Sequence, residues 1–466
     1  MKVLLLNPPY PEPGFMRNAR AEGIGIIQTQ WYPIWLAYAT GLLEKHGHIC
    51  KLIDAPPSHM FFNDVKLETK RFSPDLLVVY TSWETIPMDT KTAETLKELV
   101  GCKVVFVGPW ASINPRMILE KSKTVDYVAQ YEFDFTLLDL ANGIKPKNIL
   151  GLFWRNGKTI IQNKPRPPVT GKQLDEFPFV SDVYMRHLDI NNYSHIAQLK
   201  PFMDMFTGRG CCWGLCTFCL WVHTLTRSAY YSGAEKYRCR SVDNVIEEIK
   251  FIKEKLPNVK EIIFQDDTLP GWRAKQISQA ILNEKLDVTW SCFGRVDFKK
   301  DELALMKKSG CRVVQAGFES SNQNILNNSK KGATIKQAEN FAKWTHDVGL
   351  KVHADFILGL PGETEETLKA TQKWAYSLGL ETYQFTIPKI YPGTPFYEWL
   401  EKNSYIKDGE VNYPNLSSED IRYWARKMSR DYYFSLDHIK KLSLERLLII
   451  AKNATRAVPK LLWERW

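Results

Sequence analysis

Four cysteines lie close together near the middle of the chain, in the segment TGRGCCWGLCTFCLW (Thr207–Trp221). Three of them, Cys212, Cys216 and Cys219, have the spacing C-x3-C-x2-C. Structural zinc usually takes four ligands in two separated pairs, and no obvious fourth ligand accompanies these three. Three close thiolates can instead bind three irons of a 4Fe-4S cluster and leave the fourth iron open to another ligand. The spacing therefore predicts such a cluster, with a zinc knuckle or chance clustering as the alternative.

The remaining cysteines do not suggest a disulfide framework, because the chain has nine cysteines in all and they are unevenly spread. The longest apolar runs, Leu76–Tyr80 and Leu447–Ala451, are far shorter than the ~20 residues that a membrane span needs. The opening MKVLLLNPPY lacks the apolar core and the cleavage site of a signal peptide. We therefore expect a cytoplasmic protein.

The composition is that of a globular protein, since 44% of the 466 residues are hydrophobic and 24% are charged. The formal net charge of +10 favours anionic partners, but it is mild for this length and no Lys/Arg block is long, so solubility explains it better. The 15 tryptophans are not interleaved with basic residues as in single-strand binding platforms. Nucleic acid is not expected as a partner, although a zinc or nucleic-acid-binding module remains the alternative class of function.

Residues 1–140 alternate short apolar strands with helical segments, a pattern typical of a parallel, doubly wound sheet. Such sheets bind ligands at the carboxyl ends of their strands, and the absence of G-x-G-x-x-G argues against a nicotinamide site. Residues 141–198 are predicted to be a connector, with a hairpin signal at Asn156-Gly157 and a Pro-rich linker. The expected strands are Lys2–Asn7, Ile49–Asp54, Leu76–Thr81, Lys103–Gly108 and Asp126–Ala129.

Residues 199–390 contain six further strand–helix units, which predict a barrel or partial barrel with its chemistry at the strand carboxyl ends. The cysteine loop follows the first of these strands, so it belongs to that face. Asp266 and Asp267 follow another strand and are predicted either to face substrate hydroxyls or to cap a helix before Pro270. The expected strands are Phe202–Phe206, Glu261–Gln265, Thr289–Phe293, Arg312–Gly317, Lys351–Leu358 and Thr382–Ile387.

Residues 391–466 are predicted to be a helical extension. Within it, Leu436–Trp466 combines basic residues with an apolar stripe. One hypothesis is an interfacial helix that would give the protein peripheral membrane contact. Packing of the stripe on the barrel is the favoured interpretation.

With this cysteine spacing after the first strand of a six-unit barrel, the sequence resembles the radical S-adenosylmethionine (SAM) enzymes. Similar strings flank the cysteines and recur later, in TGRG, AGFESSNQ (Ala316–Gln323) and FILGLPGETEET (Phe356–Thr367). The opening LLLNPP and the later YEFDFT resemble the cobalamin (B12)-binding domain of one large subgroup. The resemblance implies an α/β fold with an N-terminal doubly wound cobalamin-binding domain, a partial (β/α)6 TIM-type radical SAM barrel and a helical C-terminal tail.

The same resemblance implies cofactors and roles. Cys212, Cys216 and Cys219 would hold the 4Fe-4S cluster, whose open iron chelates SAM, and SAM would be cleaved reductively to a 5′-deoxyadenosyl radical that attacks an unactivated carbon. The electron would come from a reducing partner of the flavodoxin or ferredoxin type. The residues implied to bind SAM are Phe218, Arg295, Glu319 and Ser320. Those implied to bind cobalamin are Asn7, Pro8, Ser82, Trp83, Gly108, Trp110 and Glu132.

The match departs from the family pattern in two places. Cys211 stands directly before Cys212 and is an extra thiol. The D-x-H-x-x-G motif, which supplies a cobalt-ligating histidine in many cobalamin proteins, is missing, so no such histidine is expected. Trp83 is predicted to cover the lower face of the cobalt, with plain packing as the alternative.

Several strings are most similar to the hopanoid-biosynthesis members of the subgroup, which act on the sugar-derived side chain of a lipid. They include WYPIWLA (Trp31–Ala37), LIDAPP (Leu52–Pro57) and YPGTPFY (Tyr391–Tyr397). This similarity favours remodelling of a lipid-linked or sugar-derived group, whereas C-methylation is the commonest outcome in the wider subgroup and is the alternative. The substrate is accordingly expected to be a small or a lipid-linked molecule.

Overall fold

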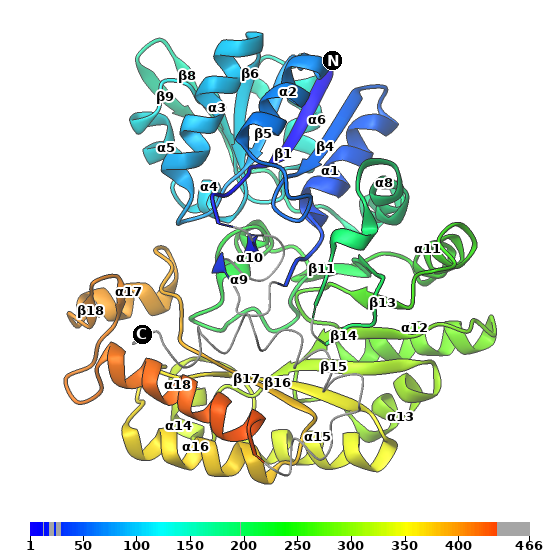
Figure 1. Cartoon of the computed structure of the whole chain (residues 1–466), viewed down its shortest axis with the longest axis vertical. Coiled ribbons are helices and arrows are strands. Elements are labelled where there is room, and N and C mark those ends of the chain that lie inside the picture. The colour runs from blue at the N-terminus through cyan, green and yellow to red at the C-terminus, as the bar shows by residue number, and fades with distance from the viewer. Residues whose placement is uncertain (13, 18–22, 25–28, 196, 436–466) are drawn as a thin grey trace.

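The computed structural model describes residues 1–12, 14–17, 23–24, 29–195 and 197–435. The described chain builds two large sheets, the first from its N-terminal third and the second from residues beyond 200, besides three two-stranded ribbons (Figure 1). The helix predicted over Leu436–Trp466 lies outside the described residues. Every helix in the described ranges is too short or too polar to cross a lipid bilayer.

The first sheet has seven strands in the order β4-β1-β5-β6-β7-β8-β9. Its five predicted strands are confirmed to within one residue at either end, and they are parallel. The hairpin at Asn156-Gly157 forms as predicted, but it pairs with β7 and extends this sheet. The strands are β1 (Lys2–Asn7), β4 (Ile49–Asp54), β5 (Leu76–Tyr80), β6 (Lys103–Val107), β7 (Tyr127–Ala129), β8 (Leu152–Asn156) and β9 (Thr159–Gln162).

Helices cover both faces of the first sheet, which explains why a strand such as β5, with the sequence LLVVY, is buried throughout. The helices of this part are α1 (Ile34–Lys45), α2 (Phe62–Phe72), α3 (Ile86–Val100), α4 (Pro109–Ile113), α5 (Pro115–Lys121) and α6 (Asp134–Ala141). A short ribbon of β2 (Phe15–Met16) and β3 (Gly23–Ile24) precedes α1, and the 3-10 helix η1 (Pro146–Asn148) precedes β8. Two helices, α7 (Gly171–Glu176) and α8 (Val180–His187), and the 3-10 turn η2 (Ile190–Asn192) lead to the second sheet.

The second sheet has six parallel strands in the order β10-β13-β14-β15-β16-β17. No pairing joins β10 to β17 among the described residues, so the sheet is the partial barrel that the sequence predicts. Its strands are β10 (Phe202–Met205), β13 (Glu261–Phe264), β14 (Trp290–Gly294), β15 (Cys311–Gly317), β16 (Lys351–Ile357) and β17 (Thr382–Thr386).

Local sequence signals begin and end the helices of this barrel. In α15 (Ile335–Val348), Thr334 and Gln337 form a capping box, and Gly349 ends the helix with a φ of 69°. The other helices on the outer side are α11 (Val242–Lys255), α12 (Gly271–Asn283), α13 (Lys300–Lys308), α14 (Gln323–Asn328) and α16 (Glu365–Ser377). The chain continues through α17 (Pro395–Lys402), a hairpin of β18 (Ile406–Lys407) and β19 (Glu410–Val411), and α18 (Ser418–Tyr433).

Helix α1 joins the two domains. Ten of its twelve residues are buried, and a helix that is apolar on nearly all sides must have neighbours on nearly all sides. The ring of Trp35 lies 5.4 Å from that of Phe206, and the Phe206 amide donates to the Tyr38 hydroxyl at 3.2 Å. Just before the helix, the Tyr32 hydroxyl donates to the Phe202 carbonyl at 2.8 Å. The two sheets therefore share one continuous apolar core.

Buried ion pairs also cross between the domains. Arg209 lies in β11 (Gly208–Gly210), which pairs with β12 (Tyr237–Cys239) directly before the cysteine loop. Its guanidinium donates to the Asp134 carboxylate at 2.7 and 3.2 Å and lies 4.5 Å from the Trp35 ring. On the neighbouring strand, Arg238 pairs with Glu132 at 2.6 Å. The cysteine loop is thus tied through its preceding strand to the start of α6.

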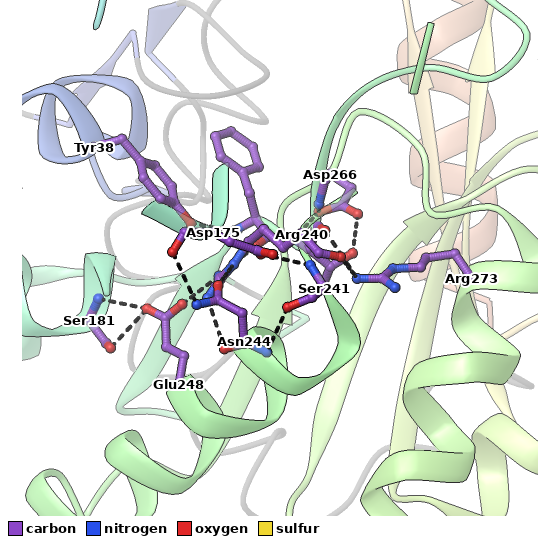
Figure 2. Close-up of polar contacts among 12 residues, drawn as sticks. Tyr38, Asp175, Ser181, Arg240, Ser241, Asn244, Glu248, Asp266 and Arg273 are labelled. Carbon is purple, nitrogen blue, oxygen red and sulfur yellow. Dashed lines mark hydrogen bonds and ion pairs between the residues drawn. The ribbon is translucent and has the colours of Figure 1, made fainter. Parts of the chain in front are cut away.

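The connector is fixed to the barrel by a polar network around Arg240, shown in Figure 2. Arg240 pairs with Glu248 of α11 at 2.5 Å, and the Ser181 amide and hydroxyl donate to the same carboxylate at 3.1 and 2.9 Å. The Ser241 amide donates to Asp175 at 2.7 Å. Both connector helices are therefore held on α11 by side chains with complementary charge or hydrogen-bonding groups.

Asp204, a buried residue of β10, gives a testable pH dependence. Its carboxyl accepts a hydrogen bond from Tyr184 at 2.6 Å, yet burial raises its pKa to about 8. The folded protein therefore binds more protons at this site than the unfolded chain does. Its contribution to stability is full below about pH 4 and declines until the pH passes about 8. Asp204→Asn keeps an oxygen for Tyr184 and removes the titration.

We expect the urea midpoint of Asp204→Asn, relative to that of the unaltered protein, to increase between about pH 5 and pH 8 and to stay constant above that. The comparison isolates Asp204 because the other groups titrate alike in both proteins. A difference in midpoint that is independent of pH over this window would contradict a raised pKa for Asp204.

Candidate active site

The loop that carries the three cysteines is held from both sides. The Thr217 amide, between Cys216 and Phe218, donates to the Ser329 carbonyl at 3.0 Å, and the Tyr230 hydroxyl donates to the Cys211 carbonyl at 2.9 Å. Gly214 has a φ of 63°, and a Cβ there would overlap the Tyr230 ring, so this turn requires glycine. The loop conformation is therefore set by packing around the cysteines as well as by the cysteines themselves.

The cysteine side chains lie in an environment that fits a cluster. Burial raises the pKa of the Cys216 thiol and raises that of Cys219 to about 12, while Lys331 and Arg295 oppose the shift at Cys216. Thiolates bound to iron at this loop would therefore have two cations beside them. Across the described ranges, no three His, Cys, Asp or Glu side chains converge tightly enough to hold a single metal ion, whereas a four-iron cluster draws on more widely separated sulfurs.

The two charged residues predicted to bind SAM are brought together at the strand ends. Arg295 follows β14, and its guanidinium donates to the carbonyls of Lys331 and Gly332 at 3.0 and 2.9 Å and to Asp297 at 2.9 Å. Glu319 follows β15 and pairs with Lys331 at 2.6 Å. Lys331 was not predicted from the sequence. It follows α14, with no strand end nearby, so neither its position nor its residue type singled it out.

Glu319 has an unusual backbone conformation, with a φ of 65°. Such angles are uncommon for residues with a side chain and concentrate at functional sites. The amides of Phe318 and Glu319 both donate to the Asp355 carbonyl, at 2.8 and 3.1 Å, which holds the turn in place. Burial raises the pKa of Glu319, with Lys331 opposing the shift. The turn directs this carboxylate toward Lys331.

The other predicted residues of the barrel differ in their surroundings. The Ser320 hydroxyl lies 3.4 Å from that of Thr371 on α16, and Phe218 is half-buried against the core. Asp266 is fully buried, and its carboxylate accepts from the Thr207 and Gly208 amides at 2.6 and 3.3 Å and from Tyr237 at 2.5 Å. It therefore fixes β11 and β12, which differs from both roles that its sequence position suggested. Asp267 is half-buried beside it.

The residues predicted to bind cobalamin gather at the carboxyl edge of the first sheet. Asn7 ends β1, Ser82 and Trp83 follow β5, and Gly108 follows β6, on three adjacent strands. Trp83 is 42% exposed, and its ring meets that of the buried Trp110 nearly at right angles, with centroids 3.7 Å apart. An accessible aromatic ring at this edge fits a flat cofactor. Gly108, with a φ of 107°, passes so close to the Thr81 carbonyl that a Cβ would lie 2.7 Å from it.

Four of these predicted residues make hydrogen bonds or ion pairs with other residues of the chain. The Asn7 amide donates to Asp54 at 2.5 Å, and the Ser82 hydroxyl lies 3.0 Å from that of Thr85. Pro8 accepts a hydrogen bond at its carbonyl from the buried Arg17, which was not predicted from the sequence and which pairs with Asp89 at 2.8 Å. Glu132 is committed to the interdomain ion pairs with Arg238 and Arg209. These side chains shape the loops of the edge and its attachment to the barrel.

The edge of the first sheet and the cysteine loop are close in the fold. Two short helices, α9 (Leu220–His223) and α10 (Arg227–Tyr231), follow the cysteines and lie between the two sheets, beneath α4 (Figure 1). The loop after β17 reaches the loop after β5, where Lys389 pairs with Glu84, next to Trp83, at 2.9 Å. Both sets of predicted cofactor-binding residues therefore border the same region between the domains.

Comparisons with known proteins agree with this arrangement. Residues 24–141 match the B12 binding domain, and residues 205–375 match the radical SAM superfamily. The uncharacterized methyltransferase PH0819 of Pyrococcus horikoshii is 29% identical, over 100% of this chain and 99% of its own length. The cytidylyl-2-hydroxyethylphosphonate methyltransferase of Streptomyces wedmorensis is 25% identical over 86% of each chain. The radical SAM methyltransferase TsrM from Kitasatospora setae, solved with cobalamin and a [4Fe-4S] cluster, shares the fold with a TM-score of 0.68 and 17% identity, covering 94% of this chain and 82% of TsrM.

The chain therefore carries a region that matches the B12 binding domain followed by one that matches the radical SAM superfamily, and the two matches together support a cobalamin radical SAM enzyme. Its cofactors are those of the two domains, namely a 4Fe-4S cluster, SAM and cobalamin. Reductive cleavage of SAM by a radical SAM domain needs a reductant. The α/β fold class predicted from the sequence is confirmed.

Proposed function

We propose that this enzyme transfers a methyl group from SAM, by way of cobalamin, to a carbon atom of a small molecule. The observation that carries the proposal is the meeting of the two candidate cofactor sites, where the loop of Trp83 and Glu84 contacts the loop after β17. The full-length similarity to a protein named as a methyltransferase supports the same activity.

When bound, the cluster and SAM supply a radical that removes hydrogen from an unactivated carbon, and cobalamin supplies the methyl group. The chain contributes binding, orientation and exclusion of water. In this proposal Cys212, Cys216 and Cys219 hold the cluster as thiolates. Arg295, Glu319 and Lys331 bind the charged and polar groups of SAM, with Phe218 and Ser320 lining the site. Trp83 would contact the cobalamin ring.

Remodelling of a lipid-linked or sugar-derived group is the second candidate function. It is favoured by the strings shared with the hopanoid-biosynthesis members, such as WYPIWLA (Trp31–Ala37). In the structure most of this string belongs to α1 and is buried between the domains. A string in that position is needed for packing, whatever the substrate is. It is therefore weaker support for remodelling than the similar methyltransferases are for methyl transfer.

The products formed from SAM distinguish the two functions. The protein is purified without oxygen, reconstituted with iron, sulfide and cobalamin, and should then bind about four irons per chain. After reduction with SAM present, methyl transfer predicts S-adenosylhomocysteine in proportion to bound cobalamin, and none when cobalamin is omitted. Formation of 5′-deoxyadenosine without any cobalamin-dependent S-adenosylhomocysteine would reject methyl transfer in favour of remodelling. Failure to form either product would reject both functions.

A further inference from the structure

The inner face of the barrel sheet carries two adjacent rows of side chains on β14 to β17. Strand pairing places Phe293, Gln315, His353 and Thr382 in one row, and Gly317, Asp355 and Gln384 in the next. The alternate residues of these strands point to the outer helices. Phe318 contacts Phe341 of α15, and Phe356 contacts Trp374 of α16. The two rows therefore lie on the face turned away from those helices.

This inner face is polar, and it is open to solvent at its last two strands, β16 and β17. Gln384 is exposed although it lies in the last strand of a covered sheet, and the Asp355 side chain is 35% exposed. Thr386 and Phe293 are half-buried on the same face. A sheet face that only completed the core would be apolar and sealed. An open polar face inside the barrel is where a ligand can enter.

Hydrogen bonds organise the polar groups of this face. One ring nitrogen of His353, Nδ1, lies 2.8 Å from the Thr382 hydroxyl, and the other, Nε2, lies 3.4 Å from both Asp355 and Gln384. Burial lowers the pKa of His353, but the charge of Asp355 and the hydrogen bonds with Asp355 and Gln384 together raise this pKa above its usual value. Asp355 and Gln384 therefore have a defined position before any ligand binds.

One buried side chain on this face has an unused donor. Gln315 is only 3% exposed, and its Nε2 has no hydrogen-bond partner among the residues that the structure describes. An unmade bond at a buried amide is unfavourable by ~1–3 kcal/mol, so such groups usually mark a missing ligand or water. Gln315 stands directly across from His353 in the register. Its unused donor therefore belongs to the same inner face.

The inner face also lies between the candidate cofactor sites. A Cβ at Gly317, in the row of Asp355 and Gln384, would overlap the Glu319 carboxylate and come within 2.7 Å of the Lys331 amine. At the far end of β17, Lys389 reaches Glu84 beside Trp83. A molecule bound on Asp355 and Gln384 would accordingly lie next to the residues assigned to SAM and toward those assigned to cobalamin.

We propose that Asp355, Gln384 and Gln315 bind the substrate, and that the substrate is a neutral, polyhydroxylated small molecule. Asp355 accepts a hydrogen bond from a substrate hydroxyl, Gln315 donates one, and Gln384 can do either. A phosphate or carboxylate would be repelled by Asp355, and an acyl chain would leave these groups unpaired. This inference rests on the proposed function, because it takes the SAM and cobalamin sites as assigned there.

Equilibrium dialysis of the reconstituted holoenzyme with SAM tests the proposal. The probes are radiolabelled methyl β-D-glucopyranoside, methyl β-D-ribofuranoside and myo-inositol, with inorganic phosphate and hexanoate as probes of the other classes. We expect at least one of the three polyols to bind more tightly than phosphate or hexanoate. Loss of a hydrogen bond to a charged group should weaken that binding about tenfold or more in Asp355→Asn. Gln384→Ala should weaken it as well.

Matched variants keep the test specific. Asp347 on α15 is 36% exposed, nearly the same as Asp355, and lies on the outer helices, so Asp347→Asn should bind the polyol as the unaltered protein does. Gln279→Ala on α12 is the control for Gln384→Ala. If Asp355→Asn fails to fold, Gln384→Ala still decides the question. Binding of none of the polyols, tighter binding of phosphate or hexanoate, or equal polyol binding by both inner-face variants would overturn the proposal.

The same preparation separates this inference from the proposed function. Substrate-free formation of S-adenosylhomocysteine by the unaltered holoenzyme reports on methyl transfer and does not involve the inner face. Polyol binding without S-adenosylhomocysteine would keep the binding site and reject methyl transfer. Formation of S-adenosylhomocysteine without polyol binding would keep methyl transfer and reject the proposed binding site.

Discussion

Replacement of Cys212 by alanine is expected to reduce SAM cleavage to background, whereas replacement of the adjacent Cys211 leaves it nearly unchanged. A 4Fe-4S cluster that is bound by three cysteine thiolates is not retained by two of them, and without the cluster no electron reaches SAM. Cys211 stands outside the C-x3-C-x2-C spacing, and its sulfur lies 3.6 Å from the Thr268 hydroxyl. The two variants remove the same atoms from neighbouring positions, so the spacing alone predicts the difference.

Iron per chain and 5′-deoxyadenosine after reduction are the quantities to measure. Cys212→Ala should fold, because the cysteine loop is also held by Ser329 and Tyr230 and because the Cys212 side chain is exposed. Cys239→Ala, on β12, is a second control for loss of a thiol elsewhere. Iron binding and SAM cleavage that persist in Cys212→Ala but disappear in Cys211→Ala would move the first ligand to Cys211.

Replacement of Arg209 by methionine is expected to lower the free energy of unfolding by about 3–5 kcal/mol, the range for a buried ion pair that loses one partner. Arg209 and Asp134 are both fully enclosed, and methionine would leave the Asp134 carboxylate without its cation. The change also removes the guanidinium from the Trp35 ring. Because this ion pair joins the domains, the strand before the cysteine loop should lose one of its two buried ion-pair attachments near α6, while the pair of Arg238 with Glu132 remains.

Urea unfolding of Arg209→Met against Arg186→Met measures the effect. Arg186 pairs with Glu44 and Asp182 at the surface, so its loss should change the free energy of unfolding by less than about 1 kcal/mol. Adding Asp134→Leu to Arg209→Met should recover much of the loss, since the unpaired charge is then gone. Equal effects of the two arginine variants would show that the interdomain pair contributes no more than a surface pair.

The sequence predicts the strands well because parallel strands covered by helices are short, continuous apolar runs. The segment LLVVY of β5 is apolar throughout, as expected for a strand buried on both faces, and its predicted end differs from the observed one by one residue. The hairpin of β8 and β9 was predicted from Asn156-Gly157, but its pairing with β7 was not. Turn chemistry is local, whereas the strand against which a hairpin pairs depends on tertiary contacts.

The candidate site likewise combines features that the local sequence indicates with features that depend on tertiary contacts. The cysteine spacing is local, and it indicates the cluster without any knowledge of the fold. Asp266 shows the limit, because its position after a strand suggested a ligand-facing carboxylate, while the donors that bury it come from Thr207 and Tyr237, remote in sequence. Lys331 could not be found because only the folded chain brings it to Glu319.

The burial of α1 determines how this enzyme can be divided or recombined. A helix with ten of twelve residues buried, in contact with both sheets, offers no surface at which the two halves could part cleanly. A B12 domain expressed alone would expose the rings of Trp35 and Tyr38 to water, and a barrel expressed alone would expose Phe202 and Phe206. Chimaeras that exchange the first domain should therefore be soluble only if α1 and the strand β10 come from the same parent.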